Sequence, residues 1–360
     1  MTATPPIEIA AIPPLEERAM AEARAHLDAL TKPPGSLGRL EELMVVVAGI
    51  TGRPRPALRR PAIVIAAGDH GVARHGISAY PTDVTGQMVA NFLAGGAAVN
   101  QLAAAAGTEV IVLDVGVAGP ARPGGPGSGG ARLVARRIRG GTADMTAGPA
   151  MERREAEAAI AAGGELAAQL VAAGIDVIGI GEMGIGNTTA ASAIVAALTG
   201  RPPGDVTGRG TGVDDAGWRR KVAAVERAIA VNGPDPLDPV GVLAALGGLE
   251  IAALVGITLE ATRAHVPVVL DGFITGAAAL LAARLAPGAP ARWIAAHRSS
   301  EPGHAVALDA LGLRPILELD LRLGEGTGAA LAIGILRAAV RVRDGMATFA
   351  SAAVSGPAGR

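Results

Sequence analysis

Residues 61–71, Pro-Ala-Ile-Val-Ile-Ala-Ala-Gly-Asp-His-Gly, decide the fold class of this chain. They form a continuous apolar run that ends in glycine and polar residues. Strands of a parallel sheet that is covered on both faces show this pattern. The sequence therefore predicts an α/β, doubly wound fold with a mostly parallel six-stranded sheet. Similar runs alternate with amphipathic segments of helical length and lie at residues 110–115, 176–180, 266–270, 293–296 and 316–319.

Glycine-rich or polar segments follow the predicted strands. In an open parallel sheet such segments lie at the carboxyl edge, where ligands bind. Although they are scattered through the sequence, we expect them to converge in space around one site. They are residues 68–71, 116–119, 181–189, 271–276, 297–304 and 320–325.

Composition narrows the class of protein. A chain of 360 residues with 50% hydrophobic content can form one large domain, or one large and one small, with ample core. Its net charge of -1 offers no electrostatic footprint for nucleic acid or an anionic membrane. It has no cysteine, which excludes disulfides and thiolate metal sites. We expect a soluble cytoplasmic protein, because no leader pattern precedes residue 14 and acidic residues interrupt the apolar segments.

The N-terminal part has helical apolar spacing over residues 15–30 and 37–47. Between these helices, residues 32–38 (Lys-Pro-Pro-Gly-Ser-Leu-Gly) cannot remain helical. We interpret them as a rigid arm that carries Lys32 toward an active site, in its own chain or across a dimer. The alternative is an ordinary interhelix loop. A second loop, rich in glycine and proline at residues 116–130, is predicted to lie on the surface and is assigned no chemistry.

Glu325 stands between glycines in residues 322–328, Arg-Leu-Gly-Glu-Gly-Thr-Gly. A helix that begins at about Gly326 would direct unpaired N–H groups and a positive dipole end at a ligand in front of Glu325. This arrangement predicts a site for a partly anionic ligand beside a potential base. The alternative is a flexible turn whose solvated glutamate favours the helix N-terminus.

Residues 181–188 resemble a phosphate loop in which Asn187 stands where the lysine belongs. Without that charge a nucleoside triphosphatase is disfavoured, but the backbone of a glycine turn before a helix can still hold one phosphate or a carboxylate. Glu182 in this turn is expected to meet a hydroxyl or a cationic ring, with a solvated turn glutamate as the alternative. The turn's expected ligand-binding residues are Glu182, Gly184, Gly186, Asn187 and Thr188.

Further phosphate-binding groups are predicted in two other places. One is the glycine loop Gly208, Arg209 and Gly210, with Lys221 about two turns into the helix that follows. The other is Arg298 with Ser299 at the end of a predicted strand. Each feature also occurs without a ligand, but together they indicate a phosphate ester.

The six histidines form no helical metal-binding pair. For Asp69 and His70, and for His297 with His304, a supporting hydrogen-bonding role is favoured over cation binding. The nucleophile pattern Gly-x-Ser-x-Gly is absent, as is Gly-x-Gly-x-x-Gly after the first strand. We therefore expect a transfer reaction that uses no metal and no cofactor, and a dinucleotide oxidoreductase is disfavoured.

Seven motifs carry a resemblance to a known family. In this order, across about residues 30–350, they resemble the nicotinate-nucleotide:dimethylbenzimidazole phosphoribosyltransferases of cobalamin lower-ligand synthesis. These enzymes transfer the phosphoribosyl group of nicotinate mononucleotide to dimethylbenzimidazole or a related base, which gives α-ribazole 5'-phosphate and nicotinate. The motifs are residues 32–38, 68–72 (Gly-Asp-His-Gly-Val), 84–91 (Val-Thr-Gly-Gln-Met-Val-Ala-Asn), 181–189, 271–273 (Asp-Gly-Phe), 297–304 (His-Arg-Ser-Ser-Glu-Pro-Gly-His) and 322–328.

The resemblance implies a Rossmann-like large domain over residues 61–328. It also implies a smaller helical domain from both chain ends, residues 1–60 and 329–360, and a homodimer. Glu325 matches the family's catalytic base, while Gly184, Lys221 and Ser299 match positions around the phosphate or ring of the nucleotide. Asp271, which opens the Asp-Gly-Phe motif, is assigned to substrate binding. A non-catalytic nucleotide-binding subunit is the alternative, and the intact Glu325 argues against it.

The resemblance also sets the expected chemistry. An azole nitrogen that attacks the anomeric carbon inverts it, and Glu325 takes the proton that becomes acidic. A helix N-terminus lowers a carboxylate's pKa, so Glu325 needs desolvation to remain a base. Tyr80, Met88, Leu323 and Phe92 are expected apolar walls for a flat ring, with plain core packing as the alternative for Phe92. Which base is used stays open among dimethylbenzimidazole, adenine and phenolic rings.

Overall fold

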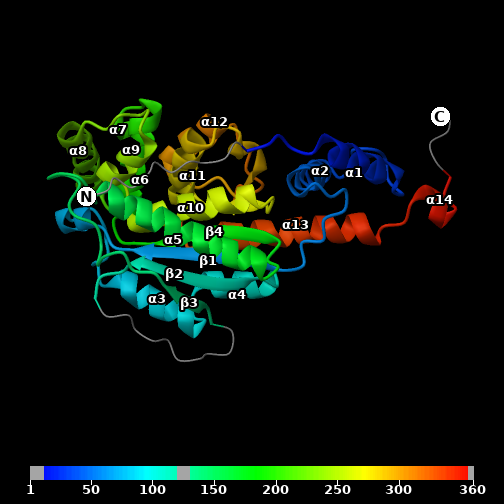
Figure 1. Cartoon of the computed structure of the whole chain (residues 1–360), viewed down its shortest axis with the longest axis horizontal. Helices are drawn as coiled ribbons and strands as arrows, with labels where there is room; N and C mark the ends of the chain where they lie inside the picture. Colours follow the sequence, from blue (N-terminus) through cyan, green and yellow to red (C-terminus); the bar gives the residue numbers. More distant parts are fainter. Residues whose placement is uncertain (1–11, 120–129, 356–360) are drawn as a thin grey trace.

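The structure, a computed structural model, describes residues 12–119 and 130–355. Its centre is one six-stranded sheet in which every strand pair is parallel, with strand order β3-β2-β1-β4-β5-β6 (Figure 1). The predicted doubly wound α/β fold is therefore confirmed. The strands are β1 (Pro61–Gly68), β2 (Glu109–Gly116), β3 (Arg132–Ala135), β4 (Val177–Met183), β5 (Val268–Leu270) and β6 (Trp293–Ala295).

The unbroken apolar runs arise because both faces of the central strands are covered. In β1, Ala62, Val64 and Ala66 belong to one hydrophobic cluster. Ile63 and Ile65, which point to the opposite face, belong to a second cluster. The period of two along a strand thus supplies two separate cores from one sequence run.

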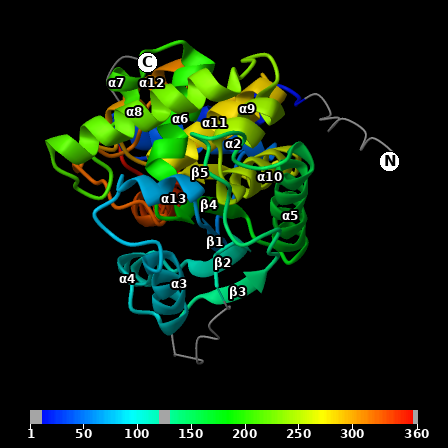
Figure 2. The ribbon, with the colours of Figure 1, turned by 90° about the vertical axis from the view of Figure 1, so that its left-hand side faces the viewer.

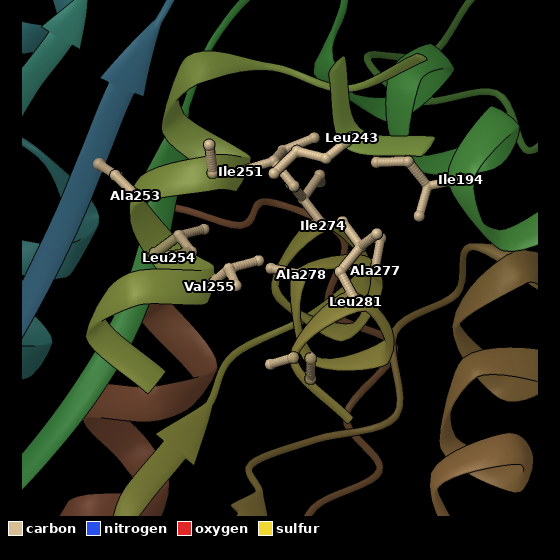
Figure 3. Packing of buried hydrophobic residues seen from close by; sticks show 14 of the residues in the cluster. Ile194, Leu243, Ile251, Ala253, Leu254, Val255, Ile274, Ala277, Ala278 and Leu281 are labelled. Atoms are coloured by element: carbon tan, nitrogen blue, oxygen red, sulfur yellow. The ribbon is translucent and has the colours of Figure 1, made fainter. Parts of the chain in front are cut away.

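The first face is covered by helices rich in small residues, some of which contact the strands while others pack on those helices. They are α5 (Arg153–Ala172), α6 (Asn187–Thr199), α9 (Pro239–Leu246), α10 (Leu249–Arg263) and α11 (Phe273–Leu285). Figure 3 shows α6, α9, α10 and α11 meeting through Ile194, Leu243, Leu254 and Ala278. Helices α5 and α10 approach so closely that a Cβ at Gly163 would overlap the carbonyl oxygen of Ala253. Glycine is therefore required at that crossing.

The second face is covered by α2 (Arg39–Thr51), α3 (Val84–Ala94), α4 (Ala98–Ala105) and α13 (Thr327–Gly345). Figure 2 shows α3 and α4 beside β2 and β3, away from α10 and α11. The remaining helices are α1 (Glu17–Ala29), α7 (Pro203–Val206), α8 (Asp215–Asn232), α12 (Pro302–Leu311) and α14 (Phe349–Ala352), with short 3-10 helices at Gly71–His75 and Ala289–Arg292.

Both chain ends contribute to a third, smaller cluster. Leu27 of α1, Met44 of α2 and Ala339 of α13 are buried in it. Helix α13 spans two environments, because Ala329 and Ile333 near its start pack in the second sheet cluster. In Figure 1, α1, α2 and α14 lie at the end of the molecule opposite α3. Division of the chain after residues 60 and 328 stays a prediction.

One predicted strand is wrong. Residues 316–319 form an isolated parallel bridge, Leu317 with His297, and the Ile316 N–H donates to the Ala295 carbonyl of β6, but Glu318 and Leu319 are exposed. This segment lies at the edge beyond β6, where a cover over both faces is lacking. The sixth strand is instead β3 at the other edge, and its half-exposed, arginine-flanked sequence hid it from an apolar pattern.

Among the described residues, the stretch Val84–Ala105 is long and apolar enough, by composition, to span a membrane. It comprises two helices, however, because α3 ends at Gly95, whose φ is 80°. Both helices pack on the sheet, with Val89 and Val99 buried. Most of the predicted loop at residues 116–130 lies outside the described residues.

Candidate active site

A pocket of about 810 Å³ lies at the carboxyl edge of the sheet. Its walls come from the turns after β4, β5 and β6, from helix α3 and from residues 320–325. Four of the six predicted segments, residues 181–189, 271–276, 297–304 and 320–325, thus meet around this cavity. The other two, residues 68–71 and 116–119, contribute Asp69 and residues 117–119 to a separate cavity. The predicted site residues that line it are Tyr80, Met88, Glu182, Gly184, Asn187, Thr188, Gly210, Ser299, Leu323 and Glu325.

Glu325 holds an unusual backbone position in this pocket. Its φ is 63°, in the left-handed region, and it lies between Gly324 and Gly326, which also have positive φ. Helix α13 begins directly afterwards, with Gly326 as its N-cap, close to the predicted start. The side chain is buried, and burial together with the charge of Asp271 raises the pKa of Glu325 to about 7. A carboxylate with this pKa can accept a proton near neutral pH.

Asp271 lies behind the pocket instead of lining it. Its side chain is 1% exposed. Oδ2 accepts a hydrogen bond from the Gly326 N–H at 3.0 Å, and Oδ1 accepts one from the Ala329 N–H at 2.9 Å. These N–H groups, expected to point at a ligand, are therefore bound inside the protein. Asp271 was assigned to substrate binding from the sequence, but in the structure its carboxylate binds the N-terminus of α13.

A second carboxyl group, Glu182, stands at the end of β4 against the segment of Glu325. A Cβ at Gly324 would overlap the Glu182 Oε1 atom, so glycine lets the two segments touch. The Asn187 side-chain amide donates a hydrogen bond to Glu182 Oε2. Burial, followed by the charge of Asp271, raises the pKa of Glu182 to about 8. A cationic ring or a hydroxyl donor in the pocket would compensate this buried group.

The opposite end of the pocket carries the groups expected to hold a phosphate. Lys221 of α8 is fully buried, and its Nζ donates to Thr188 Oγ1 at 3.0 Å. Burial lowers the pKa of Lys221 to about 8, although the charge of Glu301 opposes this effect. Glu301 Oε1 also accepts the Gly210 N–H at 2.8 Å. Lys221 therefore lies directly behind two pocket-lining residues, Thr188 and Gly210.

The apolar end is built by Tyr80, Met88 and Leu323. Tyr80 and Leu323 are 56% and 55% exposed, so a ring bound between them would cover apolar surface. Phe92 is fully buried in the second sheet cluster and does not line the pocket. Its expected role as a ring wall is therefore wrong, since at this position on α3 the side chain points into the core.

Several predicted residues lie outside the pocket. Gly208 and Arg209 line a neighbouring cavity, and Arg298 is exposed and pairs with Glu318 at 3.1 Å. Gly186 is the N-cap of α6, which begins at Asn187 as predicted. Lys32 is buried in an ion pair with Glu41 at 2.8 Å. Its arm joins α1 to α2, at the end of the molecule opposite α3 (Figure 1).

His70 supports the glycine turn from behind, whereas Asp69 lines a separate cavity, where its Oδ2 accepts the Ala118 N–H at 2.7 Å. His70 Nε2 lies 2.7 Å from Glu250 Oε1, and the ring is fully buried. Although burial opposes it, the charge of Glu250 raises the pKa of His70. A Cβ at Gly184 would overlap the carbonyl oxygen of Gly68, so the turn rests directly on this layer. Within residues 12–119 and 130–355, no group of three or more acidic or histidine side chains is placed to hold a metal.

The polar pocket residues that sequence reasoning did not assign to the site include Asn91, His297 and Glu301. Neither ring nitrogen of His297 has a hydrogen-bond partner within the described part of the chain. All three belong to motifs quoted above, at residues 84–91 and 297–304. Their positions within those motifs were a signal that could have identified them.

The pocket at the carboxyl edge of this parallel sheet combines a buried lysine behind Thr188, a carboxyl group with a pKa of about 7 and an apolar wall, which is typical of an α/β enzyme that acts on a phosphorylated substrate. A family model described as Phosphoribosyltransferase matches residues 12–354. The chain belongs to this family, that of the nicotinate-nucleotide–dimethylbenzimidazole phosphoribosyltransferases, and is an enzyme of that class.

Named relatives agree over almost the whole chain. The nicotinate-nucleotide–dimethylbenzimidazole phosphoribosyltransferase of Chloroflexus aggregans is 56% identical over 346 residues, which cover 96% of each protein. The enzyme of the same name from Thermus thermophilus is 53% identical, over 95% of this chain and 99% of the relative. A crystal structure of CobT from Thermus thermophilus superposes with a TM-score of 0.88 at 52% identity, covering 94% of this chain and 100% of that one.

Proposed function

We propose that the protein transfers the phosphoribosyl group of nicotinate mononucleotide to dimethylbenzimidazole or a related base, with Glu325 as general base. The products are α-ribazole 5'-phosphate and nicotinate, and the anomeric carbon is inverted. The names of the relatives supply the substrates. The observation that carries the residue assignment is Glu325 itself, which is buried in the wall of the pocket and whose pKa is raised to about 7 by burial and the charge of Asp271.

The chemistry needs little beyond positioning and one proton acceptor. The pyridine nitrogen of nicotinate mononucleotide is already cationic, so the glycosidic bond can break with its electron pair returning to that nitrogen. The azole nitrogen forms the new bond from the opposite face and becomes part of a cationic ring. The N–H at the other ring nitrogen of the azole then loses its proton to Glu325, which restores a neutral azole.

Substrate placement follows the polarity of the pocket. The phosphate occupies the end formed by Thr188, Gly210 and Ser299, with Lys221 behind them as the cation. The azole lies between Tyr80, Met88 and Leu323. Glu182 faces a ribose hydroxyl or the pyridinium ring, where a positive charge stabilises its ionised form.

We further propose that the protein is a homodimer. We also propose that it acts in the cytoplasm, since a phosphorylated substrate does not cross membranes unaided. The exposed side chains Tyr80, Leu319 and Leu323 offer apolar surface for a partner to cover. The arm lies away from α3 in its own chain and Lys32 is buried against Glu41, so the predicted contact with an active site would be made across the dimer by residues 33–38. Sedimentation analysis distinguishes the dimer from a monomer.

The test of function is product analysis with nicotinate mononucleotide and a panel of bases: dimethylbenzimidazole, adenine and a phenol. Release of nicotinate with formation of an α-configured nucleotide is expected, and nuclear magnetic resonance reads the configuration. A β-configured product would contradict inversion. A protein that binds nicotinate mononucleotide yet releases no nicotinate in a single turnover would contradict the enzymatic role.

A further inference from the structure

The carboxylate of Asp271 occupies a position that the proposed reaction leaves unexplained. It follows β5, is 1% exposed and belongs to a different strand turn from Glu325. Burying a carboxylate is unfavourable unless hydrogen bonds satisfy it. Its hydrogen bonds come from the N-terminus of α13, where the Gly326 and Ala329 N–H groups donate to its two oxygens.

The rest of that first turn is also satisfied internally. The Thr327 N–H donates to the Gly324 carbonyl at 3.1 Å, and the Gly328 N–H is a further donor to Asp271. The Ala330 N–H donates within the helix, to the Gly326 carbonyl at 2.9 Å. A free helix N-terminus presents these groups to nearby anions. Here they are all engaged behind Glu325, so they leave its carboxylate unstabilised.

The charged groups around Glu325 come from four directions. Glu182 approaches from β4. Arg322, which belongs to the same segment as Glu325, is exposed at the rim of the pocket. Glu250, on α10, adds negative charge near Glu182. After β6, His297 lies with Nε2 4.0 Å from Asp271 Oδ1, and a Cβ at Gly328 would overlap its ring. The charge of Asp271 raises the pKa of Glu325, and the charges of Asp271 and Glu325 both raise the pKa of Glu182, so the three carboxyl groups influence one another.

We propose that Asp271 is a positioning residue that makes Glu325 an effective base. It binds the N–H groups of α13 that would otherwise stabilise the Glu325 carboxylate, and its own negative charge disfavours a second one beside it. Both effects favour uptake of a proton by Glu325. This role deepens the proposed function, because it rests on Glu325 as the proton acceptor.

The experiment follows the ionisation of Glu325 itself, separately from turnover. Infrared titration of the carboxyl band assigns Glu325 by its loss in Glu325→Gln. The variants Asp271→Asn and Asp271→Ser remove the charge, and serine retains a hydroxyl acceptor for the helix. In either variant we expect the midpoint of Glu325 to move to lower pH, by about 1 unit or more. With it, kcat should fall while KM for both substrates stays unchanged.

Asp114→Asn is the matched control. Asp114 is also a buried aspartate that accepts a backbone N–H, from Val117 at 2.9 Å, but it lies at the end of β2. The Asp114→Asn variant should be less stable than the wild type, but the midpoint of the Glu325 titration should stay unchanged. If one Asp271 variant does not fold, the other still reports how the titration midpoint of Glu325 depends on the charge of Asp271.

The outcomes separate the two proposals. An unmoved or raised midpoint of Glu325 in a folded Asp271 variant overturns the role of Asp271, whatever happens to the rate. A Glu325→Gln protein with undiminished kcat instead overturns the base assignment, while the infrared midpoint still reports the influence of Asp271.

Discussion

Replacing Glu325 by glutamine removes the group that we propose to accept the azole proton. Burial and the charge of Asp271 raise the pKa of Glu325 to about 7. In the wild-type protein, the ionised fraction then falls about tenfold for each pH unit below that value, and kcat/KM should fall with it. Glutamine cannot take the proton at any pH. The variant should therefore lose this acidic limb altogether.

The size of the loss follows from the step that Glu325 serves. A general base contributes about 10²- to 10⁴-fold, which corresponds to about 2.7–5.4 kcal/mol in the barrier. Glutamine has the shape of glutamate, so the left-handed turn and the pocket wall remain. We therefore expect kcat to carry the loss, with little change in KM for the azole.

The assay is steady-state kinetics across the wild-type limb, with each substrate varied while the other is saturating. Ionisation of the azole is measured separately, and circular dichroism confirms folding of the variant. Retention of wild-type kcat would refute the base assignment. Persistence of the limb in the variant would assign that titration elsewhere, first to Glu182, whose pKa burial raises to about 8.

Three other residues give separate predictions. Lys221→Ala should raise KM for nicotinate mononucleotide more than it lowers kcat, because a lost hydrogen bond to a charged group costs about 1.5–3 kcal/mol of binding free energy. A loss confined to kcat in steady-state kinetics contradicts this. Glu182→Gln should raise KM for the nucleotide or slow the chemical step without changing azole affinity, and equal kinetics would return Glu182 to a structural role. Because the pKa of Glu182 is raised from 4.5 to about 8, its stabilising effect is complete below the unfolded value and is lost as pH rises through the folded one. The Tm of the unliganded protein should thus fall over this range, and less steeply in Glu182→Gln. Lys32→Met leaves Glu41 buried without its partner and should lower Tm, whereas adding Glu41→Gln should recover part of the loss; equal melting of single and double variants counts against the pair.

The fold was accessible from sequence because local patterns report burial on both faces. The runs that became β1, β2 and β4 are continuous and apolar, and such strands survive only beneath helices on each side. Glycine turns likewise marked where α6 and α13 begin. The strands at the two edges of the sheet were harder to predict from the sequence. At an edge, one side of the strand lacks a neighbour, so β3 includes the exposed Arg132, while residues 316–319 are mostly apolar and yet form an isolated bridge in place of a strand.

Some features of the candidate site were likewise predictable from the sequence, and others were not. Sequence alone determined that the turns after β4, β5 and β6 converge and that Glu325 stands between glycines before a helix, since both follow from strand direction and local residue type. Only the tertiary structure decided that Asp271 takes up the N–H groups of that helix and that Lys221 lies buried behind Thr188. Asp271 and Gly326 are 55 positions apart in sequence. Their contact depends on β5 lying beside β4 and on how α13 crosses the sheet, and no local pattern of residues encodes that packing.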